Sequence, residues 1–277
     1  MSWIDLDGAV NVRDLGGMSA DGHKIAEHRL LRGDNLQDLT PADVQTLVDG
    51  VGLTTVVDLR SPQEVTLEGP GPLTRVGSVR HAYHSMLPER GTNTDVVADA
   101  IALSRRAASL DRYPQDARTG SYLGYLEDRP DQVVAALRAI ATSRGAALVH
   151  CAAGKDRTGV IVAMALTVAG VDRDAVIADY AATGERIDAI MERLRSSPTY
   201  AADLLGHVDE DHTPRPETMA AFLGQLQQRH GGVVAWLDAH GFGQDEQDQL
   251  RERLGAAVGV RREIPVPVSV PIAVRVV

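Results

Sequence analysis

The chain has 277 residues, of which 44% are hydrophobic and 24% are charged, as in an ordinary globular domain and unlike a disordered chain. Its net charge is −10 and no long run of Lys or Arg occurs, which excludes a nucleic-acid binder with a basic face. Aromatic residues make up only 4%, so we expect a core of Ala, Val, Leu and Ile.

The chain contains one cysteine, which excludes an internal disulfide and favours a reducing compartment. Residues 1–17 contain no basic start followed by an apolar stretch, so no signal peptide is predicted. No run reaches the roughly 18 apolar residues that span a bilayer. We therefore expect a cytoplasmic protein without stable membrane insertion, and secretion without a signal peptide stays open.

The first third of the chain alternates β-branched stretches with helix-start signals. Thr40 and Pro41 predict a helix, because a hydroxyl N-cap precedes a proline at the first helical position. Ser61 and Pro62, followed by Glu64, predict a second helix start. The predicted elements are strands at Asn11–Gly17, Arg29–Arg32, Thr54–Arg60 and Val76–Tyr83, and helices at Thr40–Asp49 and from Ser61.

The remainder is predicted to be mainly helical, apart from one apolar strand at Ala146–Cys151. The predicted helices cover 95–110, 119–128, 130–143 with Asp131 as its cap, 158–169, and most of 172–257. A strand, a loop and a helix in this order indicate an α/β fold with a functional loop at the carboxyl end of the strand. We expect one domain over residues 1–260 and, because of its prolines, a loose extended tail over 261–277.

One segment, Val149–Gly159, carries the strongest chemical signal. It holds Cys151, five further residues and Arg157, between the predicted strand and the predicted helix. A backbone that curls there points its N–H groups at one centre and forms an anion cradle, which the conformational freedom of Gly154 permits. The cradle, the helix dipole and Arg157 are expected to lower the pKa of Cys151 from its free value of roughly 8.5 and to make it a nucleophile.

The other loop residues are predicted to bind phosphate and to support the sulfur. The guanidinium of Arg157 matches two phosphate oxygens, and the Thr158 hydroxyl can donate to the sulfur. The predicted phosphate-binding residues are Ala152, Ala153, Gly154, Lys155, Asp156 and Arg157. The alternative, a buried inert cysteine, leaves the flanking His150 and the Arg-Thr-Gly sequence unexplained.

Other phosphate and metal sites are excluded by spacing. A Walker loop requires glycine where Val149 stands and Ser or Thr where Asp156 stands. No glycine-rich dinucleotide fingerprint follows a strand. No His, Cys or Glu cluster has zinc spacing, and the pair His81 and His84 is too sparse to bind a metal.

The segment His150–Gly159 resembles the phosphatase loop of the cysteine-dependent phosphatases, in the form found in bacterial tyrosine and lipid phosphatases of dual or triple specificity. The resemblance covers most of residues 8–257. It implies a protein-tyrosine-phosphatase-like, mostly parallel sheet flanked by helices, with lid-forming helices for which residues 90–130 and 183–215 are long enough. The further segments that agree are Asn11–Asp14, Leu31–Asp34 with Leu39, Val57–Ser61 with Glu64, and Asp172–Tyr180.

The resemblance also implies the reaction. Family members hydrolyse phosphotyrosine, some also phosphoserine or phosphothreonine, and many hydrolyse phosphoinositides, without a metal or other cofactor. The expected partner is a phosphorylated protein, a phosphoinositide or a small phosphometabolite, and the oligomeric state stays open. Supporting roles are expected for His150, Thr158, Asp58, Arg60, Arg13 and Asp14.

The general acid is the point of departure from the family. The family usually supplies it from an Asp on the loop after the strand at 76–83, where this chain has no Asp before Asp95. The candidates are Asp156, Glu89, Asp95 and His84, and we favour Asp156, whose alternative role is to orient loop N–H groups.

Two other side chains have open roles. Lys155 is expected to be a pocket-rim cation for polyanionic head groups, with a solvated lysine as the alternative. Tyr122 is expected to pack in the core, with pocket lining as the alternative. Three rival functions remain: a phosphatase for a sugar or nucleoside phosphate, a phosphate-binding pseudoenzyme, and a sulfur-transfer enzyme, which Arg157 disfavours.

Overall fold

The computed structural model describes residues 1–87, 117–201, 204 and 212–255. Their central feature is a six-stranded sheet in the order β1-β2-β5-β8-β6-β7. The strands from β5 to β7 are parallel, and β1 and β2 join the edge antiparallel. The predicted α/β fold with a mostly parallel sheet is confirmed. The strands are β1 Ser2–Trp3, β2 Arg13–Asp14, β5 Leu30–Gly33, β6 Leu53–Asp58, β7 Arg80–Tyr83 and β8 Ala146–His150.

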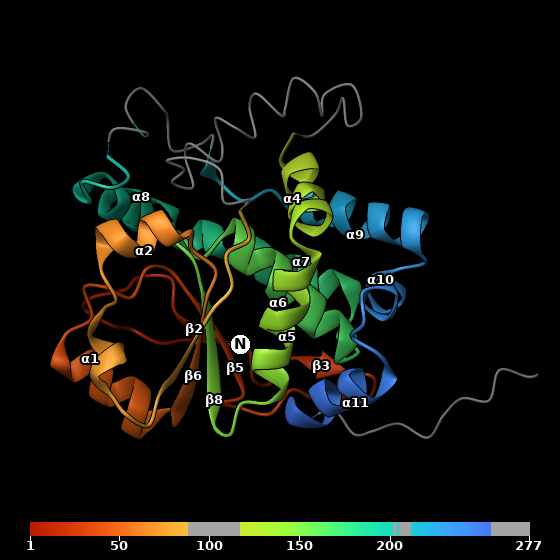
Figure 1. Ribbon diagram of the computed structural model, residues 1–277, viewed down its shortest axis with the longest axis horizontal. Helices are drawn as coiled ribbons and strands as arrows, with labels where there is room; N and C mark the ends of the chain where they lie inside the picture. The colour runs from red at the N-terminus through yellow and green to blue at the C-terminus, as the bar shows by residue number, and fades with distance from the viewer. Residues whose placement is uncertain (88–116, 202–203, 205–211, 256–277) are drawn as a thin grey trace, which may run out of the picture.

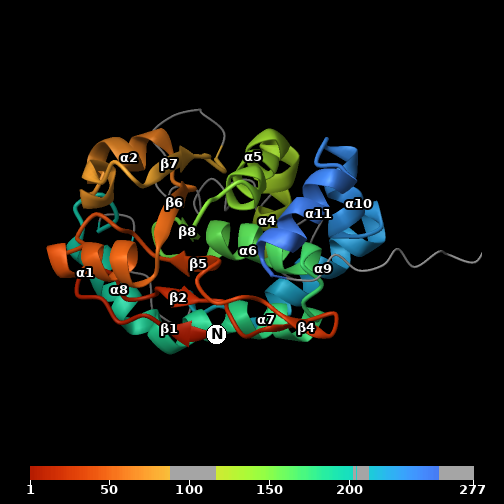
Figure 2. The ribbon, with the colours of Figure 1, turned by 90° about the horizontal axis from the view of Figure 1, so that it is seen from below.

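Helices cover both faces of this sheet. Figure 2 shows α1 on one side and α5, α6 and α11 on the other. The helices of the first half are α1 Pro41–Gln45, continued by a π-helical turn at Thr46–Gly50, and α2 Pro62–Glu68, with a 3₁₀ turn at Pro72–Arg75. Those of the second half are α4 Ala117–Asp128, α5 Pro130–Ala141, α6 Asp156–Val168, α7 Arg173–Ala182, α8 Ile187–Ser196, α9 Pro216–His230, α10 Val233–Ala239 and α11 Gln244–Arg253.

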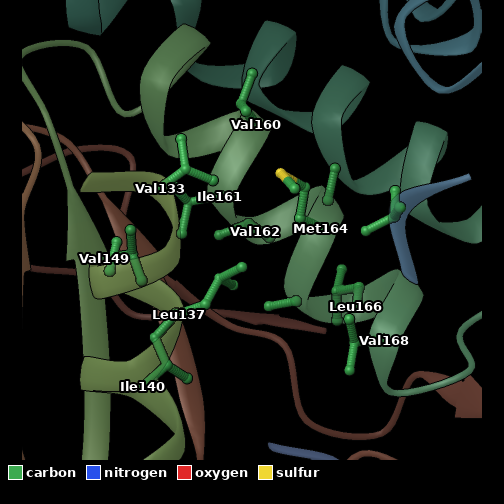
Figure 3. Packing of buried hydrophobic residues seen from close by; sticks show 14 of the residues in the cluster. Val133, Leu137, Ile140, Val149, Val160, Ile161, Val162, Met164, Leu166 and Val168 are labelled. Atoms are coloured by element: carbon green, nitrogen blue, oxygen red, sulfur yellow. The ribbon is translucent and has the colours of Figure 1, made fainter. Parts of the chain in front are cut away.

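The buried strand β8 divides the core into two hydrophobic clusters. Ala147 and Val149 face the cluster built with α5 and α6, whereas Ala146 and Leu148 face the cluster that contains Leu47 of the turn after α1. This alternation follows from the two-residue period of a strand. Figure 3 shows the larger cluster, in which side chains of α5 and α6 interdigitate beside Val149. Aliphatic residues fill most of it, as the composition predicted.

Both predicted helix starts of the first half are confirmed. Thr40 and Ser61 each cap their helix in a capping box, with Asp43 and Glu64 as the reciprocal partners. A later prediction was wrong: α5 begins at Pro130, and Asp131 lies inside its first turn instead of capping it.

Several predictions concern segments outside the described residues. These are the helix at 95–110, the candidate acids Glu89 and Asp95, most of the lid candidate at 90–130, part of that at 183–215, and the tail at 261–277. One feature was not predicted, a hairpin of β3 (Ser19–Ala20) and β4 (His23–Lys24). Its turn residues Asp21 and Gly22 both have positive φ, the conformation that an Asp-Gly pair favours between two strands. No helix of the described part is long and apolar enough to cross a membrane.

Candidate active site

The carboxyl ends of three parallel strands meet at the candidate site. Gly33 of β5 and Asp58 of β6 both pair in register with His150, the last residue of β8. Cys151 follows directly, and α6 begins at Asp156, two residues earlier than predicted. The loop between them contains Gly154, whose φ of +68° suits glycine. A Cβ at this position would lie 2.4 Å from the carbonyl oxygen of Gly33, so only glycine fits.

The carbonyl groups of the loop are bound on its outer side. The Ala152 oxygen accepts from the Asn35 N–H at 2.9 Å. The Ala153 oxygen accepts from the Asn11 side chain at 2.9 Å, and the Gly154 oxygen accepts from Arg32 at 2.8 Å. Because successive carbonyls turn outward, the N–H groups turn inward, and those of Gly154 and Thr158 hydrogen-bond the Cys151 sulfur. The loop therefore has the backbone of an anion cradle.

A buried charged network holds the donors of this outer side. Asp179 of α7 accepts from Arg13 at 2.9 Å and from Arg32 at 2.6 Å, and all three side chains are buried. Arg13 also donates to the Asn11 side chain at 2.7 Å. Both side chains that bind the loop carbonyls, Asn11 and Arg32, are thus fixed through Asp179, Asn11 by way of Arg13. Arg13 has the bracing contacts that were expected of it, through Asp179 instead of the loop itself.

Arg157 is fully buried and forms a bidentate ion pair with Glu64 of α2. Its Nη1 and Nη2 atoms each donate to one oxygen of Glu64 at 2.8 Å, and Nη1 also donates to the carbonyl of Leu59. Tyr200 also donates to Oε1 of Glu64, the oxygen that accepts from Nη2 of Arg157. The fork predicted to hold two phosphate oxygens therefore holds a carboxylate. A guanidinium has a second bidentate edge, Nε with Nη2, so this pairing is compatible with phosphate binding.

The sulfur of Cys151 is buried, and burial raises its pKa above the ordinary value. Hydrogen bonds from the Thr158 hydroxyl and the two loop N–H groups lower the pKa, and the Asp156 carboxylate raises it. The balance leaves the pKa raised, so the expected low pKa is not found. The main reason is burial of the sulfur, to which the negative charge of Asp156 adds.

Asp156 accepts a hydrogen bond of 2.5 Å from the hydroxyl of Tyr122 and lies 3.4 Å from the Lys155 amine. Burial raises the pKa of Asp156, but Lys155, Arg118 and the Tyr122 bond outweigh it and hold the pKa below its ordinary value. Tyr122 packs in the core as expected, edge-on to Tyr180, and in addition its hydroxyl reaches the loop.

Lys155 is buried, and its amine donates to the carbonyl of His212 at 2.8 Å. The side chain therefore lies neither at an open pocket rim nor in solvent, the two positions that were expected. Its charge instead joins the loop to the segment before α9 and stands beside Asp156.

The strand ends next to the loop carry a second buried network. Arg60 binds the carboxylate of Asp58 through three contacts of 2.5–3.1 Å, and donates to the Asn35 side chain at 3.0 Å. His150 lies 3.6 Å from Asp58, and burial lowers its pKa to about 4, so the ring is neutral at pH 7. Burial acts against the charge of Asp58, but His150 and Arg60 lower the Asp58 pKa to about 2.

Two further predicted residues lie away from the loop. Asp14 accepts from the N–H groups of Gly16 and His28 and so holds the glycine turn after β2. His84, a candidate acid, hydrogen-bonds Gln132 of α5 at 3.2 Å, and burial lowers its pKa.

Three functional residues have partners that the sequence alone did not reveal. Glu64 was noted as a helix-start residue and as part of a segment that resembles the family, without a partner, and it both caps α2 and binds Arg157. Arg32 and Asp179 were quoted only within longer segments. A usable signal existed in each case, because a charged residue beside a buried strand or helix face needs an opposite charge nearby.

The family of the chain follows from comparisons with known proteins. A model of the tyrosine phosphatase family matches residues 4–256. The chain belongs to the tyrosine phosphatase family. It is 30% identical over 284 residues to the triple specificity protein phosphatase PtpB of Mycobacterium tuberculosis, covering 91% of this chain and 98% of that protein. A tyrosine-protein phosphatase of Nostoc commune is 28% identical over 242 residues, 84% of this chain and 76% of that protein. The family and these relatives identify the chain as a phosphatase.

One solved structure gives a more distant comparison. TpbA of P. aeruginosa covers 75% of this chain and 96% of its own, at 17% identity and a TM-score of 0.29.

Proposed function

We propose that this phosphatase hydrolyses phosphomonoesters through a phosphocysteine on Cys151, with phosphotyrosine, phosphoserine or phosphothreonine, and phosphoinositides as substrates. The observation that carries the proposal is the loop whose carbonyls at Ala152, Ala153 and Gly154 are all bound on the outside. Inward N–H groups stabilise the equatorial oxygens of a phosphoryl group in transfer, which is the main catalytic contribution in such reactions.

The reaction has two steps. The Cys151 thiolate attacks phosphorus in line, an S–P bond forms, and the P–O bond to the leaving group breaks while Asp156 protonates the departing oxygen. Water then attacks phosphorus, Asp156 takes its proton, and the S–P bond breaks to release phosphate and the thiolate. Arg157 holds the transferred oxygens through the Nε–Nη2 edge.

The first step needs a thiolate at Cys151 and a proton on Asp156. The pKa shifts favour the opposite arrangement, a thiol and a carboxylate. The two arrangements contain the same number of protons and differ in the position of one, so they interconvert without proton uptake. A bound phosphate dianion raises the pKa of both groups, so the move to Asp156 requires that the loop N–H groups and Arg157 offset the phosphate charge at the sulfur.

We also propose that α8 covers the bound substrate. Ile187, Ile190 and Met191 of α8 pack in one cluster with Ala152, and Arg193 of the same helix binds Asp34 after β5. This helix therefore lies directly against the loop, and its opening would admit substrate.

A second candidate, a phosphatase for a small sugar or nucleoside phosphate, is favoured by the position of Lys155. The amine that was expected to bind polyanionic head groups is bound by His212 and Asp156. A substrate panel of phosphotyrosine peptide, phosphoinositide, sugar phosphate and nucleotide, run with and without chelator, separates the two candidates.

The test of the chemistry is substitution of the sulfur. We expect Cys151→Ser to abolish para-nitrophenyl phosphate turnover and to retain substrate binding, because the cradle is unchanged and only the nucleophile is lost. Arg157→Lys should lower kcat by about 10²-fold or more, because the bidentate guanidinium edge is lost. Unchanged turnover in Cys151→Ser would refute the proposed mechanism and support a different nucleophile.

A further inference from the structure

A chain of polar groups runs from α7 through α4 into the loop. The hydroxyl oxygen of Tyr180 lies 2.8 Å from that of Tyr122, which lies 2.5 Å from Oδ1 of Asp156. Both tyrosines are 1% exposed. Phenylalanine would fill the same space in the core without a hydroxyl to satisfy, so packing alone does not explain two tyrosines here.

The carboxylate at the end of this series of hydrogen bonds determines which hydroxyl donates to which. An ionised carboxylate only accepts hydrogen bonds, so Tyr122 donates to Asp156. A phenol has one hydrogen, and Tyr122 therefore accepts from Tyr180. The Oδ1 oxygen of Asp156 is occupied by this donor, whereas Oδ2 is the oxygen that lies 3.4 Å from the Lys155 amine.

We propose that Tyr122 is a positioning residue that holds Asp156 by Oδ1 and leaves Oδ2 to carry the proton that passes to the leaving group. Tyr180 fixes the direction of the Tyr122 hydroxyl. This inference rests on the proposed role of Asp156 as the general acid. It assigns a function to a residue for which the sequence indicated core packing, with pocket lining as the alternative.

The groups that face Asp156 from each packed element set the sign of the expected pH effect. Burial raises the Asp156 pKa, while Lys155 of the loop and Arg118 and Tyr122 of α4 lower it. Among the other neighbours, Tyr180 stays protonated because burial and Asp156 raise its pKa, and Asp156 raises that of the Cys151 thiol. Removal of the Tyr122 hydroxyl therefore raises the Asp156 pKa. Because the acid then stays protonated to higher pH, the basic limb of the pH profile of kcat moves to higher pH.

The test compares Tyr122→Phe with the wild type on two aryl phosphates. With phenyl phosphate, whose leaving group needs the acid, we expect kcat to fall by about tenfold, a fraction of a full general-acid effect. With para-nitrophenyl phosphate, a better leaving group, the loss should be smaller. Tyr180→Phe should shift the basic limb in the same direction by less. Tyr125→Phe is the matched control on the same helix, because the Tyr125 ring stacks on that of Tyr122 with their centroids 6.2 Å apart. It should leave kcat with phenyl phosphate and the position of the basic limb unchanged.

A double-mutant cycle separates positioning from general damage to the core. If Tyr122 acts only through Asp156, Tyr122→Phe has no further effect on the phenyl phosphate rate in an Asp156→Asn background. An equal loss in both backgrounds would overturn the proposal. An unmoved basic limb of the kcat pH profile in Tyr122→Phe would also overturn it if Asp156→Asn makes the rate more dependent on the leaving group, and the acid role would then stand. An unchanged leaving-group dependence in Asp156→Asn would reject the acid role itself, and the positioning role with it.

Discussion

At the scale of single residues, Cys151 and Asp156 act on each other. The Asp156 carboxylate raises the thiol pKa, whereas the Thr158 hydroxyl and the inward N–H groups lower it. The charge of Arg157 is bound by Glu64, so the loop amides and Thr158 are what favours the thiolate. The pKa of the sulfur is therefore set by burial, which raises it most, and by these few short-range groups.

This balance predicts the effect of neutralising Asp156. In Asp156→Asn the negative charge near the sulfur is lost, so the pKa of the Cys151 thiol should fall. Alkylation by iodoacetamide, followed over a range of pH, measures that pKa independently of turnover. The matched control is Asp131→Asn, on an exposed side chain of α5, which should leave the alkylation profile unchanged. A thiol pKa that rises or stays the same in Asp156→Asn would contradict this electrostatic account.

The spacing of Cys151, Gly154 and Arg157 was sufficient to predict the loop. A backbone that must connect a strand to a helix within so few residues has few allowed conformations. The partner of Arg157 was not predictable in the same way. Glu64 is 93 residues away in the sequence, and only the parallel pairing of β6 and β8 brings its helix to the loop. The same limit applies to Tyr122, whose aromatic side chain indicated core packing and gave no information about the partner of its hydroxyl.

At the scale of elements, one buried carboxylate joins three of them. Asp179 on α7 pairs with Arg13 on β2 and Arg32 on β5, and Arg32 continues to the Gly154 carbonyl. Breaking a buried ion pair leaves uncompensated charge in a medium of low polarity, which is far more costly than losing an exposed pair.

We therefore expect Asp179→Ala to lower the free energy of unfolding by roughly 3–5 kcal/mol, because two buried guanidinium groups lose their partner. Glu246→Ala is the control, since it breaks the partly exposed pair between α11 and Arg138. Its expected effect is roughly 0–1 kcal/mol. Urea unfolding of both variants measures the difference, and similar losses in the two would show that the buried network does not hold these elements together.

Element positions were predicted best where local chemistry determines them. The Thr40 and Ser61 caps fixed two helix starts, and the apolar run before Cys151 fixed β8. The start of α6 was misplaced because Asp156 continues the helix into what the motif describes as loop. The Asp21-Gly22 hairpin was missed although its turn pair is a recognised signal, because its strands have only two residues each.

At the scale of the whole molecule, the predicted architecture was correct because strands and helices alternate around one continuous buried strand. Buried ionisable side chains concentrate where β5, β6 and β8 end, and they tie the stability of the fold to pH. Among the residues that the structure describes, His150 has the largest pKa shift that falls close to neutral pH. Burial lowers its pKa to about 4 in the folded chain from an ordinary value of 6.5.

Between pH 6.5 and pH 4 the unfolded chain binds a proton at His150 that the folded chain does not. Stability is therefore lost as the pH falls through this window, by about 3 kcal/mol in total. Urea unfolding across the window measures the loss. His150→Asn should flatten the dependence, while His230→Asn, on an exposed side chain at the end of α9, should not. A dependence that is equally steep in His150→Asn would assign the acid sensitivity to other groups.

The most direct test of the account is whether Cys151 receives the phosphoryl group. Rapid acid quenching during turnover of para-nitrophenyl phosphate, followed by mass spectrometry of the peptide that contains Cys151, detects the intermediate. We predict a phosphoryl adduct on this sulfur in the wild type and none in Cys151→Ser. A quenched sample that turns over substrate but carries the adduct on another residue, or carries none while product appears in a burst, would contradict the assignment of Cys151 as the nucleophile.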